Sequence, residues 1–244
     1  MRETTIKQRP LYQKRNAITT AIPSFWPHVI EDASSSLAFD EHITPEDAEV
    51  LAHLAELNVT RPNAEQGDPR DIEFVFKFKD SDYMPAQTIT KLFTYQEDNK
   101  PGLTGLVSTP TEIEWKGAKD LTFGVNKAAI EAFEERNAKA EAKKHGKAAG
   151  LGDKERRLLE LLSKNSQSFF IWFSYTGAHH DLGETEGEIE DLDDADDSGP
   201  VEAFPYGDEL AIQMAEDVYP SAVKYFSAFC NPSNRGFWVS PRAC

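Results

Sequence analysis

The chemistry open to this sequence is concentrated in a dense run of carboxylates. Fifteen of its 42 acidic residues lie between Asp181 and Asp217, a stretch without Lys or Arg, and nine of those fall within Glu184–Asp197. The stretch carries almost all of the formal net charge of -16. So many like charges repel one another and present a strong negative potential to a cationic partner. The run therefore predicts binding of a basic macromolecule or a hard cation. It argues against direct, specific binding to DNA, whose phosphates carry the same sign.

A calcium loop is the main metal-binding alternative for this stretch. A calcium loop needs a bidentate Glu at position 12, and the residue at that position here is Pro205. The earlier positions of the pattern are matched by Asp194, Asp196, Ser198, Gly199 and Glu202. Because the ligand that closes the loop is missing, we expect no metal site and no cofactor.

Motifs that would indicate catalysis are missing from the sequence. It contains no Gly-rich phosphate loop, no GxSxG and no HExxH. An exposed acidic run also lacks the burial that tunes a carboxyl group as a general acid. We therefore expect a protein that is not an enzyme.

The spacing of apolar residues predicts the elements that must hold the acidic run in place. Residues 2–22 have the pattern of a basic amphipathic helix, and Thr44-Pro45 begins a helix that we expect to end near Leu57. Alternating apolar and polar residues predict strands over 72–79, 88–95 and 111–115, joined by short turns as an antiparallel meander. Helical spacing returns over 126–162 and 208–229.

A block of aromatic residues, Phe169–Phe173, is expected in the core, because large apolar side chains cannot cheaply stay in water. Phe25, Trp26 and Trp115 are expected there too. The block is far too short to span a bilayer, so we expect no membrane association.

Three spaced segments carry a family likeness. They are PLYQKR at 10–15 with IPSFW at 22–26, then TEIEWKGAKDL at 111–121, then SFFIWF at 168–173. Together they resemble the nucleosome assembly protein family, and most of all its SET/template-activating-factor branch. The order of the segments and the acidic stretch after the aromatic block match as well. The resemblance implies an α+β "earmuff" domain, with an antiparallel sheet backed by helices, and the function of a histone chaperone in nucleosome assembly on chromatin.

The resemblance also implies a domain organisation. Residues 1–23 are the end of a dimerisation helix, and residues 24–229 form the earmuff domain. Within that domain lie a basic helical insertion at 126–164 and an acidic loop at 181–207, and 230–244 form an irregular tail. Only nine residues precede Pro10, so the N-terminal helix is short. A coiled-coil seam needs several heptads, and this shortness argues against the usual homodimer.

Core histones are the partner that the resemblance implies, bound through exposed acids. Many weak ion pairs, each worth roughly 0.2–1 kcal/mol, suit reversible capture of Lys and Arg. Glu112 and Glu114, which alternate with Ile113 and Trp115, are expected on the strand face opposite the core. The other candidate histone-binding residues are Asp181, Glu184, Glu186, Glu188, Glu190, Asp191, Asp193, Asp194, Asp196 and Asp197.

Two alternatives stay open. The acidic stretch can be a solvated loop that only keeps the protein soluble, and the chain can be an acidic adaptor or inhibitor that docks on another basic protein. Lys143, Lys144 and Lys147 form a short nuclear-import candidate within an otherwise solvated helical face. The expected location is the nucleus, with shuttling to the cytoplasm as an option.

Overall fold

The computed structural model describes residues 2–37, 39–97, 105–142, 152–165, 167–177 and 201–230. At its centre is a four-stranded antiparallel sheet with the strand order β1-β2-β3-β4. The strands are β1 (Leu54–Thr60), β2 (Ile72–Phe78), β3 (Gln87–Gln96) and β4 (Gly105–Ser108). The mixed helix and antiparallel-sheet class that the sequence predicts is confirmed.

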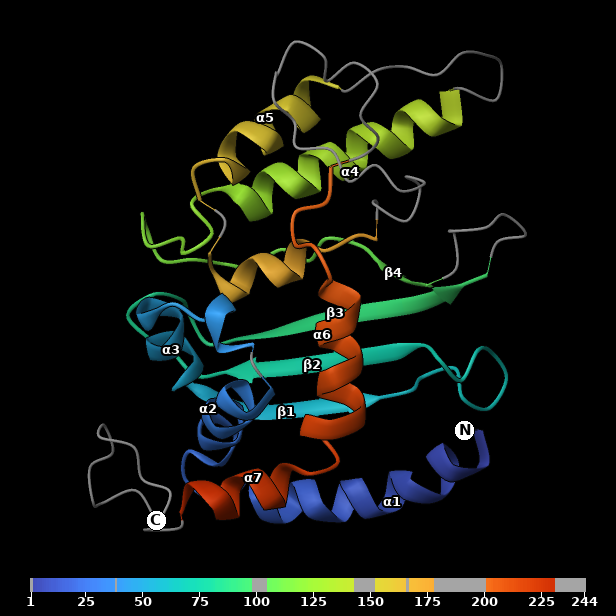
Figure 1. Cartoon of the computed structure of the whole chain (residues 1–244), viewed down its shortest axis with the longest axis vertical. Helices are drawn as coiled ribbons and strands as arrows, with labels where there is room; N and C mark the ends of the chain where they lie inside the picture. The colour runs from blue at the N-terminus through green and yellow to red at the C-terminus, as the bar shows by residue number, and fades with distance from the viewer. Residues whose placement is uncertain are drawn as a thin grey trace.

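Helices cover one face of the sheet and lie beyond both of its outer edges (Figure 1). In chain order they are α1 (Arg2–Thr19), α2 (Phe25–Leu37), α3 (Pro45–Leu51), α4 (Val125–Ala142), α5 (Asp153–Leu162), α6 (Gly207–Gln213) and α7 (Ala222–Phe229). Short 3₁₀ helices cover Asp40–His42 and Phe169–Ser174, and a π-helix over Met214–Val218 continues α6. The helix α1 lies beyond β1, while α4 and α5 lie beyond β4 (Figure 1). None of the helices in the described part of the chain is long and apolar enough to cross a membrane.

The core forms where the aromatic block meets β2. Every second side chain of β2 is buried, and the whole of Phe169–Phe173 is buried in its 3₁₀ helix. The ring of Trp172 lies edge-on to Phe74 at 5.3 Å and to Phe76 at 6.1 Å between ring centroids. Offset and edge-on geometries of this kind add to the hydrophobic gain of burial. The predictions for β2, β3 and the aromatic core are confirmed.

The helix that starts at Thr44 is shorter than expected. Thr44 and Asp47 form a capping box, as the sequence indicates, but α3 ends at Leu51 and β1 begins at Leu54. Strand pairing outweighs the helical pattern here, because Leu54, Leu57 and Val59 enter the core beside β2, where Leu57 pairs with Phe76. The expectation of a helix reaching Leu57 was therefore wrong.

The third expected strand, 111–115, was also misplaced. The strand that pairs with β3 is β4, and residues 111–115 form an extended but irregular segment. Pro110 has no N–H to donate, and the N–H of Thr111 goes to the carbonyl of Phe173 at 2.8 Å. The side chain of Gln87 takes the place of a paired strand, since it accepts from the N–H of Glu114 and donates to its carbonyl.

The PLYQKR segment fixes α1 to the rest of the fold. The guanidinium of Arg15 lies over the ring of Tyr219 at 4.1 Å and donates to the carbonyl of that residue. The side-chain amide of Asn16 donates to Asn58 at 3.2 Å and to the hydroxyl of Tyr219 at 3.0 Å. Trp26 is buried, as expected, and stacks on Tyr219. The helix predicted over residues 2–22 is confirmed, with its end at Thr19.

Candidate functional site

The second face of the sheet stays open to solvent among the described residues. Alternation along each strand places mainly polar side chains there, with Val75 and Leu92 as apolar members, and the strand register aligns them in rows across the sheet. One row across β1, β2 and β3 holds Glu56, Lys77 and Thr88. A second row, farther along the strands, holds Thr60, Glu73 and Leu92. Lys77, Thr88, Thr90 and Leu92 are exposed, whereas Glu56 and Glu73 are partly buried. We call the side chains of this face, from Glu56 to Leu92, the open sheet face.

Glu112 and Glu114 border the open sheet face. Both are exposed, while Ile113 is buried and Trp115 packs edge-on to Phe170 at 5.3 Å. The two carboxylates therefore point away from the aromatic core even though their segment is not a strand. Gln87 holds the backbone of Glu114 beside β3. The expected orientation of Glu112 and Glu114 is confirmed, and their role in binding stays a prediction.

The remaining acidic candidates lie outside the described residues, but the two ends of their segment are described. Glu202 accepts hydrogen bonds from the N–H of Gly177 at 2.7 Å and from the N–H and hydroxyl of Thr176 at 3.0 and 2.9 Å. It also accepts from the N–H of Phe204 at 3.2 Å. These contacts join the chain just before the segment to the chain just after it. The candidates in this gap are Asp181, Glu184, Glu186, Glu188, Glu190, Asp191, Asp193, Asp194, Asp196 and Asp197.

A buried lysine holds the same region from the sheet side. The side chain of Lys91, on β3, is fully buried and donates to three carbonyls, those of Thr109 at 2.8 Å, Phe173 at 3.0 Å and Tyr175 at 2.8 Å. Burial lowers the pKa of Lys91 to about 7, against the opposing attraction of Glu202. Lys91 and Glu202 thus bind residues 173–177 from two sides. These contacts fix the residues directly before the acidic segment beside β4.

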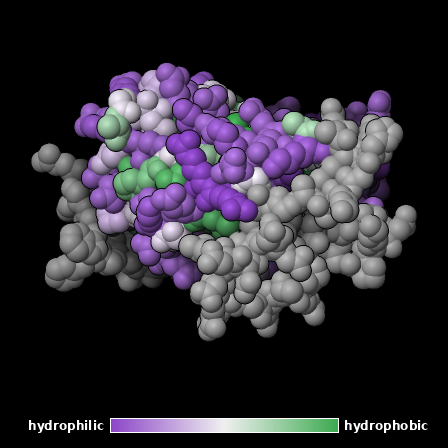
Figure 2. Space-filling model, turned by 90° about the horizontal axis from the view of Figure 1, so that it is seen from above, coloured by the Kyte–Doolittle hydropathy of each residue, from purple (hydrophilic) through white to green (hydrophobic). Residues whose placement is uncertain are grey.

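The import candidates Lys143, Lys144 and Lys147 also lie outside the described residues. Ion pairs link the described parts of the two neighbouring helices. Lys154 of α5 meets Glu131 of α4 at 2.6 Å, and Lys139 meets Glu135 within α4 at 3.2 Å. The described surface at this end of the molecule is largely hydrophilic (Figure 2). In the described residues, no group of three or more His, Cys, Asp or Glu side chains is placed to hold a metal ion.

Sequence reasoning missed three charged members of the open sheet face. The positions of Glu73 and Lys77 on this face could have been predicted from the sequence, because both residues alternate with the buried aromatic residues of β2. Glu56 carried none, because its segment was assigned to a helix.

The sequence model of the family described as nucleosome assembly protein (NAP) matches residues 2–228 of the chain. The chain belongs to the nucleosome assembly protein family. Among curated NAP relatives, the chain is 28% identical over 224 residues to NAP1-related protein 2 of Arabidopsis thaliana, covering 90% of this chain and 63% of that protein. It is 26% identical over 228 residues to Vacuolar protein sorting-associated protein 75 of Saccharomyces cerevisiae, covering 91% of this chain and 68% of that protein. The chain thus spans about two thirds of the length of these relatives.

The NAP fold is also found in a solved structure. The crystal structure of the Vps75 histone chaperone matches with a TM-score of 0.61 at 23% identity, over 93% of this chain and 88% of that chain. The likeness covers nearly the whole chain, so the earmuff architecture implied by the family resemblance is confirmed.

Proposed function

We propose that this chain is a histone chaperone that binds core histones through two acidic surfaces and assists nucleosome assembly in the nucleus. The observation that carries the proposal is NAP-family membership over residues 2–228, and the exposure of Glu112 and Glu114 supports it. The first surface is the open sheet face with Glu112 and Glu114. The second is the acidic segment that begins after Gly177 and ends before Glu202.

The two surfaces have different roles in this proposal. The acidic segment attracts a basic protein electrostatically and so raises the local concentration of that protein. The open sheet face has a fixed arrangement of side chains, with Glu56, Glu73, Glu112 and Glu114 near the ammonium of Lys77. Exposed ion pairs are individually weak, so a histone held by many of them can still be passed on to DNA.

Size-exclusion chromatography with light scattering tests the partner. The chain is measured alone and with stoichiometric core histones at about 0.3 M salt, which screens the weakest surface contacts. A complex of defined mass, together with prevention of histone–DNA precipitation, supports the chaperone. A complex with no effect on precipitation supports an acidic adaptor instead.

Charge-neutralised variants test the two surfaces. Replacing Glu56, Glu73, Glu112 and Glu114 by Gln is expected to weaken histone binding and to flatten its dependence on salt. The matched control removes four exposed carboxylates elsewhere, at Glu3, Glu134, Glu160 and Glu209. Equal losses of affinity in both variants would show that net charge acts alone and would reject the open sheet face as a binding surface.

Neutralising the acidic segment tests separately whether that segment attracts histones electrostatically. The substituted residues are Glu188, Glu190, Asp191, Asp193, Asp194, Asp196 and Asp197. We expect a slower association rate with histones, because electrostatic steering acts mainly on encounter. An unchanged affinity and salt slope would reject this role.

A further inference from the structure

The helix α1 is held to the rest of the fold at its two ends. At its start, Arg2 donates to the carbonyls of Glu65 at 2.6 Å and Gly67 at 2.9 Å, in the loop between β1 and β2. Near its end, Asn16 donates to Asn58 of β1. Between these attachments α1 runs alongside the outer edge of the sheet (Figure 1).

A cavity of about 590 Å³ lies between α1 and that edge. This volume is in the range of about 300–1,000 Å³ that is usual for ligand sites. On the helix side its wall runs from Thr4 to Gln13, which is roughly 14 Å of α-helix. That length suits about four extended residues at ~3.4 Å each.

One wall opposite α1 is the edge of a strand, and the rest of the lining comes from Ala215, Glu216, Tyr219 and Pro220. Four consecutive residues, 58–61, line the cavity from the end of β1. The strand β1 is first in the sheet order, and within the described residues no strand pairs with its outer side. An edge strand presents unpaired N–H and C=O groups that an extended peptide can pair with. The cavity therefore has the length and the hydrogen-bonding groups for strand addition.

The charge of the walls favours an acidic peptide. The charged residues that line the cavity are two arginines, Arg9 and Arg61, and one glutamate, Glu216. Arg9 and Arg61 reach the cavity from opposite walls, and each has one carboxylate partner, at Glu65 and Glu216 respectively. A guanidinium has five N–H donors, so each arginine can also bind a carboxylate of the incoming chain.

We propose that an extended, acid-bearing peptide segment of a partner protein binds between α1 and β1 and adds a short strand next to residues 58–61. This site is separate from the acidic surfaces assigned to histones and selects the opposite charge. It gives the protein a second docking point that can be occupied while a basic cargo is bound elsewhere.

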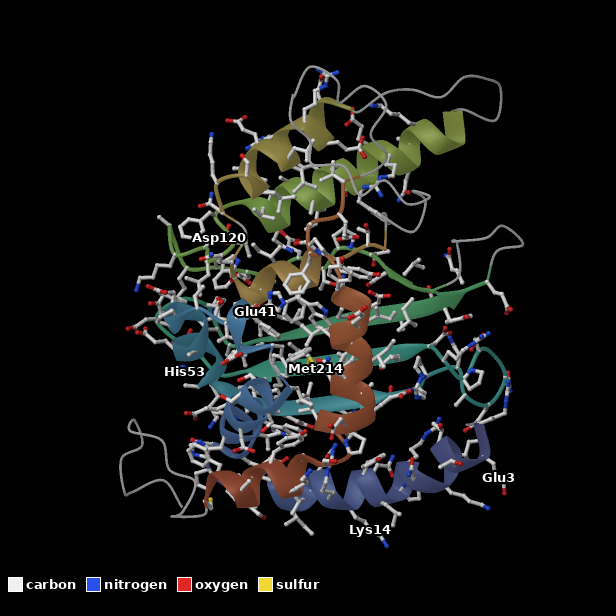
Figure 3. The ribbon with its side chains drawn as sticks, in the orientation of Figure 1. Glu3, Lys14, Glu41, His53, Asp120 and Met214 are labelled. Atoms are coloured by element: carbon white, nitrogen blue, oxygen red, sulfur yellow. The ribbon has the colours of Figure 1, made fainter. Side chains whose placement is uncertain are left out.

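The experiment uses the full chain and a fluorescein-labelled peptide of sequence VEVDVT, acetylated and amidated at its ends. Binding is followed by fluorescence anisotropy and by amide chemical shifts. We expect saturable binding, with the largest shifts at residues 58–61. Gln8→Trp, which fills the cavity from α1, should weaken binding at least about tenfold. The matched control is Lys14→Trp on the same helix, because Lys14 points away from the sheet (Figure 3) and does not line the cavity.

Three outcomes would overturn the proposal. They are no shifts at residues 58–61 at millimolar peptide, equal binding by wild type and Gln8→Trp, and equal binding of the amide analogue VQVNVT. Thermal unfolding and histone binding of Gln8→Trp are measured in parallel. We expect both to match the wild type, which separates failure of this site from failure of the fold or of the chaperone function.

Discussion

The buried carboxylate of Asp47 accepts the backbone N–H of Phe169 at 2.9 Å, across 122 residues of sequence. The same carboxylate accepts the hydroxyl of Ser168 at 2.7 Å and the N–H of Thr44 at 3.0 Å. One side chain therefore caps α3 and fixes the start of the aromatic 3₁₀ helix. Burial raises the pKa of Asp47, while these hydrogen bonds oppose the rise.

Asp47→Ala is expected to destabilise the fold strongly. It breaks the capping box that Asp47 forms with the N-cap residue Thr44, where helix caps are worth about 0.5–2 kcal/mol, and leaves the buried N–H of Phe169 unpaired, at a cost of about 1–3 kcal/mol. We expect a loss of about 3 kcal/mol in the free energy of unfolding, measured by urea denaturation. Glu46→Ala, an exposed acid in the same helical turn, is the control and should change it little. Equal effects of the two substitutions would contradict the long-range role of Asp47.

Lys91 gives the protein a measurable dependence of stability on pH. Its pKa is about 7 when folded, against an ordinary value of 10.5, so the unfolded chain binds the proton more tightly. Stability should therefore rise with pH between about 7 and 10.5, on the order of 1 kcal/mol per pH unit. In Lys91→Met this rise should disappear. The check is urea unfolding at pH 7, 8 and 9, with Lys77→Met on the open sheet face as the control. If the wild type and Lys91→Met have parallel pH profiles, the buried ammonium is not the cause.

Glu202→Gln is expected to loosen the base of the acidic segment. A neutral amide has one carbonyl oxygen in place of two charged ones, so it cannot accept all the N–H groups that the carboxylate holds. Hydrogen exchange at the amides of Thr176 and Gly177 should speed up by at least about tenfold, while β2 amides stay protected. Glu209→Gln, exposed on α6, is the matched control. Unchanged protection at Gly177 would mean that Lys91 alone holds this region.

Leu11 and Ile18 give α1 an exposed apolar stripe. Their exposed fractions are 62% and 66%, and their spacing of seven residues puts them on one side of the helix. We expect a second copy of the chain to cover this stripe, with weak, concentration-dependent dimerisation visible by light scattering. Replacing both by Glu should give a monomer at every concentration, whereas Ala17→Glu on the same helix should have a smaller effect. A wild type that stays monomeric at high concentration would contradict this prediction.

The sequence predicted the elements whose periodicity was unambiguous. The alternating aromatics of β2 and the Thr44-Pro45 helix start have local causes, which a sequence displays directly. The strand β1 could not be predicted in the same way, because Leu51, Leu54 and Leu57 also fit helical spacing and only pairing with β2 decides the matter. The irregular path of residues 111–115 depends on a hydrogen bond to Phe173. For the site, the strand pattern indicated which way Glu112 and Glu114 point, but the contacts of Lys91 and Glu202 join distant segments and left no sequence signal.

The junction at Glu202 also limits how far the acidic segment can reach. Residues 178–200 leave and re-enter the described fold at one place beside β4. A free tail of 23 residues could extend roughly 80 Å, whereas a chain tied at both ends can move at most about 40 Å from its base. The contact between Glu202 and Gly177 therefore halves the greatest distance from β4 at which this stretch of sequence can meet a basic partner.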